Sequence, residues 1–162
     1  MNYIIDAYGE EIKRLIFTYV KNHTQTDDIF QDFLIKTFKS LDRFKAKSTL
    51  KTWLYRIAIN TCKDYLRSPI HRIVQYHELS KISSKQQSVE QTSLENEQKE
   101  TMAEAVLSLP VKYREVILLK FYRDLTINEI SQSLHVKEST VRTRIMRGKK
   151  KLKTLMEGFD LE

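Results

Sequence analysis

The residues best suited to chemistry in this sequence are cations gathered on one short stretch near its end. Between Ser139 and Lys153 there are seven Lys or Arg side chains and no acidic one. A cation that neutralises a nucleic-acid phosphate releases counterions, which gives affinity that is independent of sequence and weakens with salt. The seven are Arg142, Arg144, Arg147, Lys149, Lys150, Lys151 and Lys153. A helix that only presents charge to water is the alternative, and the neighbouring residues decide between the two.

The residues in front of these cations predict a helix-turn-helix. Thr126 and Glu129 have the spacing of a capping box, in which each side chain accepts from the backbone N–H of the other residue. A first helix is expected to end at residues 135–138, and a second helix to begin near Ser139. Apolar residues share one face of the second helix, namely Val141, Ile145, Gly148, Leu152 and Leu155. Two helices joined by a tight turn, the second of them basic, are typical of duplex DNA binding.

Position along the second helix separates two kinds of candidate DNA contact. Residues near its start are expected to reach base edges in the groove, and residues further along are expected to hold phosphates. The candidates for base edges are Ser139, Thr140, Arg142, Thr143 and Arg144. The candidates for phosphates include Arg147, Lys149 and Lys150.

The whole chain has the composition of a helical protein with a polyanionic partner. Its 162 residues carry a net charge of +7, and its pI is about 9.4, which favours nucleic acid as a partner. Only 3 Gly and 2 Pro are present, as expected for a nearly all-helical fold. The single cysteine excludes an internal disulfide and favours a reducing compartment. The sequence shows no leader and no long apolar run, so a soluble cytoplasmic protein is predicted.

Charge and apolar residues are distributed unevenly along the chain. Residues 1–67 and 101–162 each carry a net charge of +4, whereas residues 68–100 carry −1 and are rich in Ser, Gln and Glu. The middle segment has too few apolar residues for a core of its own. We therefore predict an all-α fold with two small helical domains, 1–67 and 93–162, joined by a flexible linker over 68–92.

Three amphipathic helices are predicted in the first domain. The apolar residues of the first are Ile5, Tyr8, Ile12, Leu15, Ile16 and Tyr19. The second is expected to begin around Thr26, so that Asp27 and Asp28 lie in its first turn, where the helix dipole favours anions. Its apolar set includes Phe30, Phe33 and Phe38. The third helix is expected from about Thr49 to Arg67.

Catalytic and metal chemistry find little support in the sequence. Asp27, Asp28 and Asp32 could bind magnesium, but no second carboxylate cluster accompanies them. The four histidines and Cys62 lack zinc-ligand spacing. There is no Gly-rich phosphate loop and no activated nucleophile. We expect no enzyme, no catalytic residue, no metal and no cofactor.

Two long runs of the sequence resemble one bacterial family. The run DDIFQDFLIKTFKSLDRFKAKSTLKTWLYRIAINTCKDYLR, residues 27–67, resembles the promoter-melting domain of extracytoplasmic-function (ECF) sigma factors. The run LPVKYREVILLKFYRDLTINEISQSLHVKESTVRTRIMRGKKKLKTL, residues 109–155, is similar to the second conserved domain of that family. Together they cover more than half of the chain in the family's order.

The resemblance implies roles that the residues alone do not assign. Residues similar to the family's docking surface for the RNA polymerase clamp are Asp27, Asp28, Gln31 and Asp32. Residues similar to the part that opens the minus-ten element and holds a flipped base are Phe44, Ala46, Lys47, Ser48, Trp53, Arg56 and Asn60. The helix-turn-helix would read the minus-thirty-five element in the duplex. The implied partners are core RNA polymerase, promoter DNA and an anti-sigma factor, which is commonly membrane-bound, and the free protein is expected to be a monomer.

The sequence departs from the family pattern at three places. His135 stands in the turn where many members have Gly, and a left-handed backbone there tolerates His better than a branched residue. Glu138 places an acid near phosphates, which is unfavourable unless it contacts a cytosine amine. The loop at residues 45–48 reads KAKS, unlike the commoner Arg-Gly-Asp-like sequence.

Two other classes of protein fit parts of the sequence. An autonomous helix-turn-helix repressor or activator would use its N-terminal half for dimerisation, and would bind palindromic duplexes tightly without polymerase. A helical adaptor without a DNA role would show no salt-dependent DNA affinity.

Overall fold

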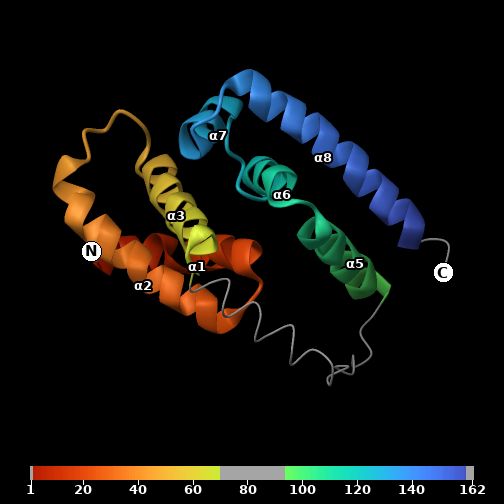
Figure 1. Ribbon diagram of the computed structural model, residues 1–162, viewed down its shortest axis with the longest axis horizontal. Helices are drawn as coiled ribbons and strands as arrows, with labels where there is room; N and C mark the ends of the chain where they lie inside the picture. The colour runs from red at the N-terminus through yellow and green to blue at the C-terminus, as the bar shows by residue number, and fades with distance from the viewer. Residues whose placement is uncertain (1, 70–93, 160–162) are drawn as a thin grey trace. The chain divides into compact units, whose positions relative to one another are not determined.

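The computed structural model describes residues 2–69 and 94–159, and all regular structure in these ranges is helical. The chain forms two compact units, Met1–Gln87 and Ser88–Glu162, here called the N-terminal and C-terminal units. The predicted all-α fold with two helical parts is therefore confirmed (Figure 1). Of the predicted linker 68–92, residues 70–92 lie outside the described ranges.

The N-terminal unit is a bundle of three helices that pack against one another. It contains α1 (Asn2–Val20), α2 (His23–Ser40) and α3 (Leu50–Arg67), with the short 3-10 turn η1 (Leu41–Arg43) after α2. Each pair of α-helices is in contact. Among the fully buried side chains of this core are Ile12, Leu15, Ile16, Ile29, Phe33, Leu54, Tyr55 and Ile59. Cys62 is also buried, and burial raises the pKa of its thiol to about 12, so the thiol stays protonated at neutral pH.

Polar contacts between sequence-distant residues tie the three helices together. The Tyr55 hydroxyl of α3 donates to Glu11 Oε1 of α1 at 2.5 Å. Lys51 Nζ lies 3.3 Å from the same oxygen. Lys36 of α2 and Asp64 of α3 form an ion pair at 3.1 Å. These contacts hold α3 in place, and α3 carries three of the candidate residues for unpaired DNA, Trp53, Arg56 and Asn60.

Three expectations for this unit were wrong. The helix α2 begins at His23, because the Asn22 side chain accepts from the N–H of Gln25, and so Asp27 and Asp28 lie beyond its first turn. Ile5 was placed on the apolar face of α1, but it is 39% exposed and Ile4 is buried instead. Phe38 was assigned to the apolar set of the second helix, but it is 68% exposed, so no other helix of the unit covers it.

The C-terminal unit is organised around its last and longest helix. It contains α5 (Leu94–Ser108), α6 (Val111–Ile117), the single π-turn η3 (Leu118–Tyr122), α7 (Ile127–Leu134) and α8 (Glu138–Phe159). The helix α8 packs on α5, α6 and α7 (Figure 1). At Gly148 an added Cβ would lie only 3.1 Å from Ile117 Cγ1, so glycine allows α8 to approach α6 closely.

A buried cluster lies where α8 packs on α6 and consists of Leu109, Tyr113 and Ile117. Leu152 and Leu155 of α8 pack against it. The apolar face that the sequence predicted for the second helix of the motif is therefore confirmed at these positions. The joint between α5 and α6 is held by Arg114, whose guanidinium donates to the Leu109 carbonyl at 2.9 and 3.1 Å.

Candidate nucleic-acid interface

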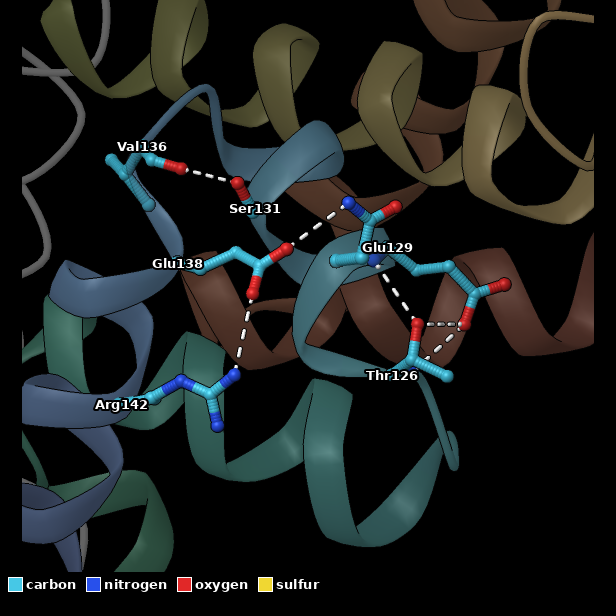
Figure 2. Close-up of polar contacts among 7 residues, drawn as sticks. Thr126, Glu129, Ser131, Val136, Glu138 and Arg142 are labelled. Atoms are coloured by element: carbon cyan, nitrogen blue, oxygen red, sulfur yellow. Dashed lines mark hydrogen bonds and ion pairs between the residues drawn. The ribbon is translucent and has the colours of Figure 1, made fainter.

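The first helix of the predicted motif is capped as the sequence indicated. The Thr126 hydroxyl accepts from the N–H of Glu129 at 3.2 Å, and the Glu129 carboxylate accepts from the N–H of Thr126 at 2.8 Å (Figure 2). Leu125 and Ile130, which flank the cap, are both buried. The predicted capping box is confirmed, and it fixes the first residue of α7.

The turn between the two helices depends on a left-handed residue. His135 has φ 54° and ψ 45°, and its N–H donates to the Ser131 carbonyl. The Ser131 hydroxyl donates to the Val136 carbonyl at 2.6 Å, and the Val136 N–H donates to the Ser131 carbonyl at 3.2 Å (Figure 2). The left-handed backbone considered at His135 is thus present, and these bonds set the direction in which α8 leaves the turn.

Glu138 is the first residue of α8, and its carboxylate contacts one residue of α7 and one of α8. Its Oε1 accepts from Asn128 Nδ2 on α7 at 3.1 Å, and its Oε2 accepts from Arg142 Nη2 one turn further along α8 at 3.3 Å (Figure 2). The side chains of Glu138 and Arg142 are 43% and 65% exposed. The acid that the sequence placed near the phosphates is therefore engaged by two neighbours.

Most of the duplex candidates gather at one open depression beside the start of α8. Its volume is about 300 Å³. The predicted residues that line it are Ser139, Thr140, Thr143, Arg144 and Arg147. Two residues of α6, Lys112 and Tyr113, complete the lining. The hydroxyls and cations of this surface can donate to phosphate oxygens or to base edges.

Arg144 differs from the other cations of this set because it is held inside the unit. Its Nη1 lies 3.2 Å from Glu115 Oε1 on α6, and the two side chains are 25% and 3% exposed. Arg147, one turn later, is exposed. Arg144 therefore has a role in joining α8 to α6, whatever it contributes to DNA.

The remaining duplex candidates lie on the flanks of α8. Lys149 Nζ lies 4.7 Å from the centroid of the exposed Phe121 ring, a cation–π arrangement. Lys149 and Arg142 line an open groove of about 480 Å³, together with Lys120, Phe121, Ile127, Ile145 and Met146. Lys150 lies on the opposite flank, where it lines a depression of about 590 Å³ with Arg147 and Lys151.

The candidates for unpaired DNA lie in the loop before α3 and on that helix. The rings of Phe44 and Trp53 are 5.1 Å apart between centroids. Trp53 is only 7% exposed, so it belongs to the core as well as to this site. Arg56 and Asn60 follow Trp53 at helical intervals of three and four, so the three share one face of α3.

The loop of residues 45–48 is basic and strained. Ala46 has φ 52°, in the left-handed region that non-glycine residues rarely adopt. Lys47 is exposed and Ser48 is half-buried. The Thr49 side chain ends the loop, because it accepts from the N–H of Thr52 and caps α3.

The polymerase-docking candidates lie along α2. Asp28, Gln31 and Asp32 are exposed at helical spacing. Asp27 is exposed as well, but its carboxylate pairs with Lys13 of α1 at 3.0 Å. Ile35 and Phe38, which are 52% and 68% exposed, continue the same stripe.

Several residues of these surfaces had no recognisable signal in the sequence. Lys112, Tyr113 and Glu115 belong to α6, more than twenty residues before α8, and no local spacing connects them to it. Ile35 and Phe38 did have a signal, since their positions fall in the same helical register as Asp28 and Asp32. Because apolar residues most often lie in a core, the register alone does not show that these two are exposed.

Comparison with protein families assigns both units. Residues 4–69 match the model "Sigma-70 region 2", and residues 99–152 match the model "Sigma-70, region 4". The chain is 31% identical over 158 residues to the RNA polymerase sigma factor SigV of Bacillus subtilis, covering 97% of this chain and 91% of the relative. The chain belongs to the ECF sigma factor family.

A second relative gives the same result, and a solved structure shows a similar fold. The ECF RNA polymerase sigma-E factor of Escherichia coli K12 is 31% identical over 157 residues, covering 91% of this chain and 82% of that protein. The fold is similar to the sigma factor RpoE of Bartonella quintana, solved in complex with the anti-sigma factor NepR. That similarity has a TM-score of 0.73 at 22% identity, covering 94% of each chain.

Within residues 2–69 and 94–159, no helix is both long enough and apolar enough to cross a bilayer.

Proposed function

We infer that this ECF sigma factor binds core RNA polymerase and directs it to promoters at which transcription begins. The observation that carries this conclusion is the pairing of two family matches in one chain, "Sigma-70 region 2" on the N-terminal unit and "Sigma-70, region 4" on the C-terminal unit. The chain lends specificity by binding alone, and no covalent step is assigned to it.

The C-terminal unit is proposed to read the minus-thirty-five element in the duplex. The support is the depression at the start of α8, where hydroxyls and cations meet on an exposed surface. In this proposal Ser139, Thr140 and Thr143 reach base edges, and Arg147, Lys149 and Lys150 hold phosphates. Arg142 and Arg144 contribute less than their charge suggests, because each is already paired with a glutamate in the free chain.

The N-terminal unit is proposed to capture unpaired bases of the minus-ten element. An extruded base needs an aromatic or apolar wall and polar groups for its edge. Phe44 and Trp53 supply adjacent rings, and Asn60 supplies an exposed amide on the same face of α3 as Trp53. Lys47 and Arg56 are cations that can follow the phosphates of the single strand. Ala46 and Ser48 shape the loop that approaches it.

The domain boundaries remain part of the proposal. A segment as long as residues 68–92 can reach at most ~80 Å at about 3.3 Å per residue. Two promoter elements roughly two helical turns apart are separated by ~70 Å. Such a segment is long enough to let each unit bind its own element as a monomer on one polymerase.

The docking stripe on α2 can be tested by charge reversal. Asp32→Lys should weaken binding to core polymerase by at least about tenfold, because it replaces an exposed anion of the proposed contact by a cation. Asp6→Lys, on the exposed side of α1, is the matched control and should change this affinity by less than about twofold. Equal losses for both variants would remove α2 as the docking surface.

Melting and docking can be separated with two amide side chains. Asn60→Ala should reduce open-complex formation, measured by permanganate reactivity of the minus-ten region, at full polymerase occupancy. Gln31→Ala should reduce occupancy and leave melting by the assembled holoenzyme unchanged. If the two variants behave alike in both assays, the assignment of separate sites to α2 and α3 is wrong.

An anti-sigma factor is the proposed regulator. The support is the groove beside α8, where the exposed side chains Phe121 and Met146 are accompanied by cations. Because Arg142 and Lys149 line this groove and are also duplex candidates, a protein bound there would exclude DNA. The RpoE protein of Bartonella quintana was solved with a partner of this class.

One experiment tests the central proposal. Purified chain is added to core polymerase, and run-off transcripts are sequenced from a library of random upstream regions. The expected result is a set of transcripts whose templates share two upstream elements. The competing function, an autonomous repressor, would give no specific transcript and a tight complex of a dimer with a palindromic duplex.

A further inference from the structure

We propose that Glu138 restrains sequence-independent DNA binding by the free sigma factor, by holding Arg142 in an internal ion pair and by placing a negative charge where phosphates approach. This inference rests on the proposed duplex contact by α8. From the sequence alone, Glu138 was expected only to be unfavourable near phosphates.

The Glu138 carboxylate accepts two hydrogen bonds, although its side chain is 43% exposed. Its two oxygens accept from different partners, Asn128 on α7 and Arg142 on α8 (Figure 2). Asn128 is itself oriented, because its Oδ1 accepts from Gln132 Nε2 at 2.8 Å. A chain of polar contacts from Gln132 to Arg142 therefore holds the negative charge at the start of α8.

Glu138 lies where a negative charge opposes the approach of phosphates. It is followed immediately by Ser139 and Thr140, which line the depression proposed to contact the duplex. At the helix start the backbone N–H groups and the dipole would otherwise attract a phosphate. The carboxylate occupies this region and competes with phosphate for the Arg142 guanidinium.

The restraint has a functional consequence for a chain with a net charge of +7. Cations on such a chain can bind the phosphates of any duplex, and the genome offers a large excess of such sites. An acid beside the proposed contact surface lowers that affinity and leaves more free chain for the polymerase.

The test compares variants of the full chain on a fluorescent duplex of random sequence, by anisotropy in about 50 to 200 mM NaCl. Glu138→Gln keeps an oxygen for Asn128 but removes the charge. We expect it to bind about fivefold more tightly at the lowest salt, with a slope of log K against log salt steeper by about one, because Arg142 gains a phosphate.

Glu157→Gln is the matched control on the same helix. Glu157 also pairs with a cation one turn away, Lys153, at 3.7 Å. It lies 19 residues after Glu138, which is about 28 Å along the helix at 1.5 Å per residue. This exceeds the Debye length, which is about 14 Å at 50 mM salt, so the affinity of Glu157→Gln for the duplex should stay within about twofold of that of the parent chain.

Arg142→Gln shows whether Glu138 acts through Arg142. In that background the effect of Glu138→Gln should fall to about twofold, the part due to direct repulsion of phosphates. Thermal melts accompany every variant, and Glu138→Gln should lower Tm by no more than about 5 °C.

Two results would overturn the inference. If Glu138→Gln binds the random duplex no more tightly than the parent chain, while the parent binds with normal salt dependence, Glu138 has no restraining role and the duplex contact stands. If neither chain shows salt-dependent binding, the proposed duplex contact of α8 fails together with the inference. If Glu138→Gln has the same effect on affinity in the Arg142→Gln background as in the parent chain, Glu138 does not act by competing with phosphate for Arg142.

Discussion

The two candidate DNA-binding regions are built from different kinds of contact. At the helix-turn-helix, the polar bonds join residues that are close in sequence: Thr126 and Glu129 are 3 positions apart, and Asn128 and Glu138 are 10 apart. In the N-terminal unit, Tyr55 and Glu11 are 44 positions apart. Local bonds fix the motif of the C-terminal unit, whereas long-range packing fixes α3 and its loop.

This difference between local and long-range contacts determines whether a substitution in each region can change DNA binding without changing stability. Trp53 is both a candidate for contact with unpaired DNA and a core residue at 7% exposure. On α8, Ser139 and Arg147 are exposed, so they can change without loss of packing. Arg144 is the exception on α8, because it forms a partly buried ion pair with Glu115, which is 29 positions away in the sequence.

The largest effect is expected at Trp53. Trp53→Ala removes a large side chain from the N-terminal core and should lower the free energy of unfolding of that unit by about 3–5 kcal/mol. Hydrogen exchange by mass spectrometry should show faster exchange in α1–α3 and unchanged exchange in α7 and α8. Phe38→Ala, at an exposed aromatic residue of the same unit, should change stability by less than about 0.5 kcal/mol. Equal effects of the two substitutions would contradict the long-range packing described for this unit.

Arg144 should show the next largest effect. Arg144→Ala leaves the buried Glu115 carboxylate without this ion pair and should destabilise the C-terminal unit by about 2–3 kcal/mol, somewhat less than a fully buried pair because Arg144 is partly exposed. Urea denaturation followed by circular dichroism measures the loss. Arg147→Ala should leave stability within about 0.5 kcal/mol while lowering affinity for duplex DNA. If Arg147→Ala is the more destabilising of the two, Arg144 is not the link between α8 and α6.

The cap of α7 should have a moderate effect. Thr126→Ala removes the acceptor for the Glu129 N–H and should cost about 1 kcal/mol, seen as faster amide exchange at the start of α7. Thr126→Ser should restore most of it. Thr154→Ala is a control, because its exposed hydroxyl only bonds to the Lys150 carbonyl of its own helix. A loss at Thr154 as large as that at Thr126 would argue against capping as the cause.

The smallest effect is expected at the strained loop, and it should be stabilising. Ala46→Gly relieves a left-handed alanine and should raise the stability of the N-terminal unit by about 0.5–1 kcal/mol. Ala7→Gly, in the exposed middle of α1, should lower it by about 1 kcal/mol. Thermal melting followed by the fluorescence of Trp53 reports on this unit, because Trp53 is the single tryptophan of the chain. The same sign for both substitutions would show that Ala46 is not strained in solution.

Sequence reasoning was most accurate where structure depends on neighbouring residues. It placed the capping box at Thr126 and Glu129, considered the left-handed turn at His135, and identified the apolar face of α8. It erred at Phe38 and at the start of α2. The periodicity of an apolar residue does not show whether another helix covers it, and the Asn22 cap preceded the expected start.

The sequence by itself determined the all-α class, the helix-turn-helix and the concentration of cations on its second helix, because helix periodicity, caps and charge are properties of adjacent residues. The tertiary structure decided which of those cations are available to DNA. Glu115 of α6 pairs with Arg144 of α8, and the burial of Trp53 makes this residue part of both a candidate site and the core. These facts depend on which helices pack together, and distances between residues far apart in the chain are set only by folding.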